Sequence, residues 1–217
     1  MTISTRILTQ TVIKYIHSNG CVSQYLDNLK EADGTLTVAE RADMIVCLFC
    51  VLKDSCNVTP VLLEDFKEAS GYQFLNKFIL EYENEKDMET QDALRNLLLM
   101  FNSAVAAGYH ELKPSPVTSN LYSLPGFIQP IPHGQGCSVR NIQAFQVLEQ
   151  VFIKSKQDSI CCTVLDVITS IYSADPANYF ILEQQCTLGQ FAEKIHTKGK
   201  TVQVNGPEIF RNTPLNP

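Results

Sequence analysis

Apolar residues recur at helical spacing along most of this chain, and this pattern restricts the fold more than any other feature of the sequence. The clearest case follows Thr37-Val-Ala-Glu40, which has the sequence of an N-terminal capping box. The segment after it stays apolar through Leu52 and has too little polar surface for a helix that stands alone. Other helices must cover it on several sides, so the chain is predicted to be all-α.

Two parts of the chain share the same order of helix signals, which indicates a structural repeat. Each begins with a cap followed by proline, continues as a short helix that ends in an acidic residue, and then starts another helix with bulky apolar residues. One copy runs from Thr59-Pro60 to Ile79 and the other from Asp175-Pro176 to Ile195. Because one helix group cannot bury its own apolar face, stacked groups build a continuous core. We predict an armadillo-like helical solenoid of about nine or ten helices with a period of ~40 to 47 residues; a compact bundle is the structural alternative.

A long loop rich in proline and glycine interrupts the helical pattern. The segment 113–140 holds five of the ten prolines, a density that no helix tolerates. The predicted organisation is helical repeats over 1–112, the loop over 113–140, helical repeats over 141–197 and an irregular tail over 198–217. The polar character of the tail leads us to expect a cut inside a longer chain.

Apolar side chains in this loop make it the candidate partner-binding segment. They are Leu121, Tyr122, Leu124, Phe127 and Ile128. A simple linker carries fewer apolar residues, and loops of this length without secondary structure are usually functional or disordered. Two interpretations remain open: the loop packs partly across the helical surface, or it binds a partner protein.

The composition argues against several classes of function. The chain has 17 Lys and Arg against 23 Asp and Glu, a net charge of −6, so the basic surface typical of nucleic-acid binding is missing. Its longest apolar run, Met44 to Leu52, is much shorter than the ~20 residues of a membrane span. A hydrophobic content of 45% argues against disorder. We expect a cytoplasmic protein with no nucleic-acid partner and no direct membrane insertion.

No residue pattern predicts catalysis, a metal site or a cofactor. Cys47 and Cys50 have the spacing of a redox or zinc pair, but they lie inside an apolar helical segment and no second pair of ligands exists. We expect both thiols to pack in the core. His133 and Cys137 lie four residues apart in the glycine-rich part of the loop, which leaves a small cytosolic Cys/His hydrolase as the enzymatic alternative.

Several packing motifs resemble those of a known family. They are Leu63-Glu-Asp-Phe66, Gly71-Tyr-Gln-Phe-Leu75, Val164-Leu-Asp-Val-Ile168, Asn178-Tyr-Phe-Ile-Leu-Glu183 and Phe191-Ala-Glu-Lys-Ile195. These segments resemble the N-terminal armadillo-like region of the large BEACH and WD-repeat scaffold proteins, in the Alfy-like (blue cheese-like) group or its immune-cell paralogue. The resemblance implies a non-catalytic scaffold in selective autophagy of protein aggregates, or in vesicle trafficking and antigen handling if the paralogue is the better match. It also implies a larger polypeptide that associates with autophagic or endosomal membranes through other domains.

The signature modules of that family are missing from this sequence, which has no tryptophan and no zinc-finger pattern of cysteines. The activities of the BEACH domain, the WD40 propeller and the FYVE finger therefore do not transfer to these residues. The sequence predicts a protein-interaction scaffold segment with no catalytic residues and no cofactor, whose partners are other proteins.

Overall fold

The computed structural model describes residues 8–32, 34–108, 139–175, 178, 182 and 188–198, and these residues form nine helices and no strand. The helices are α1 (Gln10–Ser18), α2 (Cys21–Glu31), α3 (Val38–Ser55), α4 (Val61–Glu68), α5 (Gly71–Tyr82), α6 (Met88–Ala104), α8 (Ile142–Lys154), α9 (Asp158–Ala174) and α11 (Leu188–Lys198). The prediction of an all-α fold is confirmed. The predicted loop, apart from its last two residues, and the tail after Lys198 lie outside the described residues.

Local sequence signals set several of the helix ends. The Thr37 side chain accepts a hydrogen bond from the Glu40 backbone N–H, and the Glu40 carboxylate accepts one from the Thr37 N–H at 2.8 Å, so the predicted capping box is present. Gly20 separates α1 from α2 in the left-handed conformation, with φ of 61°. Pro60 is itself the N-cap of α4, with ψ of 2°, and the helix begins at Val61.

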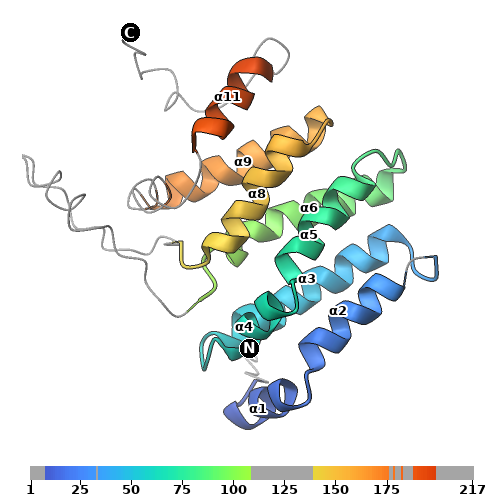
Figure 1. The fold of residues 1–217 in the computed structure, drawn as a ribbon, viewed down its shortest axis with the longest axis vertical. Coiled ribbons are helices and arrows are strands. Elements are labelled where there is room, and N and C mark those ends of the chain that lie inside the picture. Colours follow the sequence, from blue (N-terminus) through green and yellow to red (C-terminus); the bar gives the residue numbers. More distant parts are fainter. Residues whose placement is uncertain are drawn as a thin grey trace, which may run out of the picture.

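The helices stack in groups of three along one direction. Helices α3, α6 and α9 pack on one another in chain order, and α5, α8 and α11 form a second row beside them (Figure 1). Helices α2 and α5 begin at residues 21 and 71, and α3 and α6 begin at 38 and 88, so the first two groups are 50 residues apart. The next group follows after about 70 residues, because the predicted loop segment lies between α6 and α8. The helical solenoid is confirmed, but both spacings exceed the predicted period.

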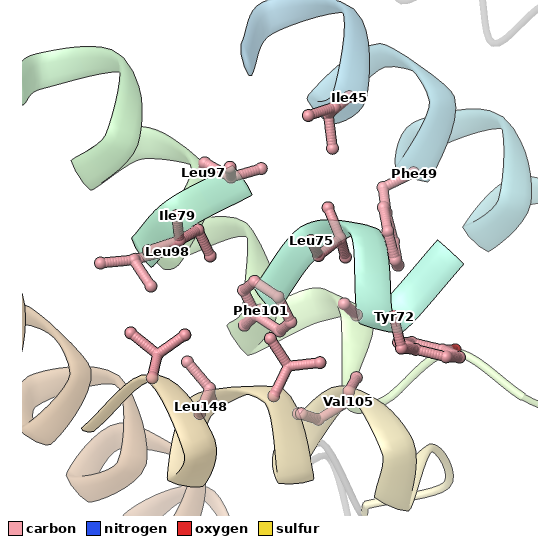
Figure 2. Packing of buried hydrophobic residues seen from close by; sticks show 14 of the residues in the cluster. Ile45, Phe49, Tyr72, Leu75, Ile79, Leu97, Leu98, Phe101, Val105 and Leu148 are labelled. Atoms are coloured by element: carbon pink, nitrogen blue, oxygen red, sulfur yellow. The ribbon is translucent and has the colours of Figure 1, made fainter. Parts of the chain in front are cut away.

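A single apolar core runs through the stack, from Ile13 on α1 to Phe191 on α11. Figure 2 shows its central part, where side chains of α3, α5, α6 and α8 meet around Phe101. Phe101 is fully buried, and so is Leu148 on the next repeat. Each helix group thus completes its burial against the neighbouring group, which is the physical reason that the repeats stack.

Two buried polar side chains join neighbouring elements of the stack. Arg41 on α3 donates a hydrogen bond to the Tyr82 hydroxyl at 2.9 Å, and its guanidinium lies 5.2 Å from the centre of the Phe78 ring. Asn141 accepts a hydrogen bond from the Ala144 N–H as the N-cap of α8 and donates to the Tyr72 hydroxyl at 2.7 Å. Each side chain is nearly inaccessible to solvent, so these bonds fix the register between helices.

None of the described helices is long and apolar enough to cross a membrane.

Candidate protein-interaction surface

The apolar residues proposed as partner-binding, Leu121, Tyr122, Leu124, Phe127 and Ile128, lie outside the described residues, as do His133 and Cys137. The structure does describe the two points that the loop connects. The Val105 carbonyl accepts hydrogen bonds from the backbone N–H groups of Arg140 and Asn141, at 2.8 and 2.9 Å. The segment just after α6 and the segment just before α8 therefore lie side by side, at the N-terminus of α8.

An open groove runs between α5 and α8, starting close to Asn141, and both polar side chains and the apolar Val147 and Leu80 line it. It consists of two hollows with volumes of about 120 and 550 Å³, and Gln73 and Gln150 line both of them. Tyr72 and Gln143 line the smaller hollow, which lies beside Asn141. The larger hollow extends along the two helices as far as Glu81 and Lys154.

Primary amides are the commonest side chains in the groove. They are Gln73, Asn76, Gln143, Gln146 and Gln150. On α8 the three glutamines and Lys154 are spaced by three or four residues, so they lie on one face of the helix. The Asn76 amide donates a hydrogen bond to the Gln150 side-chain oxygen at 3.1 Å and joins the two walls. Gln73 and Gln150 are exposed, so their remaining donors and acceptors face solvent.

The charged side chains in the groove are mainly basic. Lys67, Lys77 and Lys154 line it, together with the single acid Glu81. This balance is opposite to that of the whole chain, whose net charge is −6. Lys67 also forms a long ion pair of 3.7 Å with Glu64, which lies outside the groove, whereas Lys77 and Lys154 are exposed at the other end.

The prediction that Cys47 and Cys50 pack in the core is wrong, because both are exposed on α3. The core face of this helix carries Ile45, Phe49 and Leu52, and the two thiols project from the opposite side. The high apolar content of α3 predicts a helix that is covered on all sides, but its neighbours α4 and α6 leave the side with Cys47 and Cys50 open to solvent. Among the described residues no group of three His, Cys, Asp or Glu side chains is placed to hold a metal ion.

Two titratable groups near the groove, the buried Tyr72 and the half-buried Cys56, have raised pKa values. Burial raises the pKa of the Tyr72 hydroxyl, which is held by its hydrogen bond with Asn141. Burial also raises the pKa of the Cys56 thiol, so this cysteine stays protonated and weakly nucleophilic at neutral pH. These groups pack and position helices.

His17 and Asp65 form a contact that the sequence did not indicate. The His17 Nδ1 lies 2.9 Å from one carboxylate oxygen of Asp65 and 3.0 Å from the other. The pair joins α1 to α4, and 48 residues separate its members along the chain. It ties the first short helix to the next repeat and is partly exposed.

The chain is similar to part of two curated proteins. It is 32% identical over 196 residues to the human WD repeat- and FYVE domain-containing protein 4, and 30% identical over 195 residues to the mouse protein of the same name. Each match covers 89% of this chain. The resemblance to the Alfy-like family is thereby confirmed.

The matched segment is a small part of these Alfy-like relatives, since the chain spans about 6% of their length. Their names describe repeat and domain content and not an enzymatic activity. No protein-family model and no solved structure matches the chain.

Proposed function

We propose that this chain is a protein-interaction segment of a non-catalytic scaffold. The observation that carries the proposal is the open, amide-lined groove between α5 and α8 on a stacked helical surface. Such stacks present extended surfaces whose shape is set by the repeat, and such surfaces are used for binding. The similarity to an Alfy-like family of WD-repeat proteins supports the same conclusion.

The finer role that fits this family is an adaptor in selective autophagy of protein aggregates, with a scaffold in vesicle trafficking or antigen handling as the alternative. In either role the segment works in the cytoplasm within a larger polypeptide and contributes a binding surface. The loop residues Leu121, Tyr122, Leu124, Phe127 and Ile128 are a second proposed partner contact, because they are more apolar than a simple linker requires.

Quantitative affinity capture tests the proposal. The wild-type chain is compared with a chain in which residues 115–136 are replaced by a short Gly/Ser linker, after circular dichroism shows equal helicity and thermal stability. We expect a reproducible set of cytoplasmic proteins on the wild-type chain, part of which is lost with the loop. Capture of no protein beyond those on an unrelated helical solenoid of equal net charge would refute the scaffold function.

A further inference from the structure

We propose that the groove between α5 and α8 binds an extended, acidic peptide segment. This inference rests on the proposed function as a scaffold and names the chemistry of its partner. It draws on three observations: the amide lining, the dimensions of the groove and the charge of its walls.

The amide lining suits a polypeptide backbone. Each primary amide offers two N–H donors and a carbonyl acceptor, which matches the alternating N–H and C=O groups of an extended peptide. Gln146 and Gln150 on α8 face Gln73 on α5 across the groove, whereas Asn76 is buried and bonds to Gln150. The bond between Asn76 and Gln150 uses only part of the hydrogen-bonding capacity of these two side chains. A backbone seated between the helices therefore meets donors and acceptors on both sides.

The dimensions of the groove match a short extended segment. From Gln143 to Lys154 the polar face of α8 is about 16 Å long, given a rise of about 1.5 Å per helical residue. An extended chain advances about 3.3 Å per residue, so the groove takes about five residues. An α-helical partner would present its side chains and not its backbone groups to the amides.

Charge determines which peptide fits. Lys77 and Lys154 are exposed at one end of the groove, and the charges lining it are three lysines and Glu81. An acidic peptide gains two exposed cations as partners, whereas a basic peptide is repelled. The proline-rich loop is a poor occupant by this criterion, because residues 113–140 contain Lys113 and Arg140 and no Asp or Glu.

A selection from a displayed library of random peptides tests the proposal. The library is selected on the wild-type chain and depleted on the Lys77→Glu/Lys154→Glu variant, and the enriched peptides are measured by fluorescence polarisation. We expect an excess of Asp and Glu in the enriched peptides, and binding that is at least about tenfold weaker to the depleting variant. Binding should also weaken as the salt concentration rises from about 0.05 M to about 0.5 M.

Two further variants separate a groove from general electrostatic attraction. Lys14→Glu/Lys53→Glu makes the same change in net charge at exposed positions on α1 and α3, and should change binding by less than about twofold. Gln146→Leu/Gln150→Leu keeps the charge but removes two amides. It should weaken the binding of the same peptides by about fivefold or more. Circular dichroism and thermal melting establish that each variant is folded.

Several outcomes would overturn the proposal. They are a library without enrichment, enriched peptides without an acidic excess, and equal loss of binding in the control variant.

Binding of vesicles that contain phosphatidylserine in place of peptides would assign the lysines to a membrane surface. If wild type and Lys77→Glu/Lys154→Glu capture the same proteins equally well, the proposed peptide binding in the groove is refuted, but the proposed scaffold function is not. A wild-type chain that captures no protein would refute the scaffold function itself.

Discussion

Replacement of Gly71 by alanine tests the packing of α4 against α5. Gly71 is the first residue of α5, and a Cβ atom placed there would lie 2.4 Å from the Cζ of Phe66. The Phe66 ring is fully buried and cannot move freely, because it packs edge-on against Phe49 at 5.0 Å and Tyr72 at 5.1 Å between ring centres. The added methyl group must therefore displace an aromatic cluster.

The expected size of the effect follows from two opposing terms. Alanine in place of glycine favours a helix by up to about 1 kcal/mol, so the substitution would stabilise the protein if space were available. Overpacking a well-filled core costs about 1–3 kcal/mol, and the overlap with Phe66 is severe. We expect Gly71→Ala to lower the free energy of unfolding by about 1–2 kcal/mol in net terms.

A double-mutant cycle with Phe66→Leu isolates the steric term. Leucine lacks the outer ring atoms that the new Cβ would meet, so Gly71→Ala should be neutral or stabilising in that background, with a coupling energy of about 1–2 kcal/mol. Urea unfolding followed by circular dichroism measures all four proteins. Gly34→Ala is the control: Gly34 has φ of 83° and no atom near its Cβ position, so the cost there is conformational and does not depend on Phe66. A stabilising Gly71→Ala in the wild-type background, or a cycle without coupling, would refute this account of the packing.

Three further predictions concern polar contacts and thiol exposure. Asn141→Ala removes the cap of α8 and leaves a buried hydroxyl on α5 without its partner, so chemical unfolding should show a loss of about 2–3 kcal/mol; a loss below about 0.5 kcal/mol would contradict this role. Hydrogen bonds from Thr37 lower the pKa of the Glu40 carboxyl below its ordinary 4.5, so its stabilising effect is present above that value and is lost as the pH falls through the lower folded-state pKa. Glu40→Gln should therefore flatten the acid side of the curve of stability against pH, and an unchanged curve would show that the capping box does not contribute. Native-state alkylation followed by mass spectrometry should modify Cys47 at least about tenfold faster than the buried Cys161, and equal rates would contradict the orientation of α3.

The sequence was sufficient to predict the helical class and the start of α3, because the signals for both are local. The capping box at Thr37 acts within one turn of a helix, so it can be identified without knowledge of the tertiary fold. The solenoid could also be predicted from the repeated order of helix signals, because single helix groups cannot bury their apolar faces alone. The predicted period was shorter than the 50 residues that separate the first two helix groups.

The orientation of side chains on α3 and the groove could not be predicted in this way. Apolar content does not say which side of a helix its neighbours cover, and so the exposed Cys47 and Cys50 were placed in the core. The walls of the groove come from Gln73 and Gln150, which are distant along the chain and meet only because α5 stacks on α8. The one available signal was the helical spacing of glutamines on α8, within a helix whose other residues are largely apolar and buried.

Site-specific photo-crosslinking tests the central claim that this chain binds other proteins through the groove between α5 and α8. A photoreactive benzophenone amino acid is placed at position 80, where Leu80 lines the larger hollow, or at position 166, an exposed site on α9. Both chains are irradiated in cell extract after thermal melting shows equal stability, and the crosslinked peptides are identified by mass spectrometry. We predict crosslinks at position 80 to extended segments rich in Asp and Glu, suppressed by the peptides selected from the library. Equal crosslinking at both positions, or crosslinks confined to position 166, would contradict the claim.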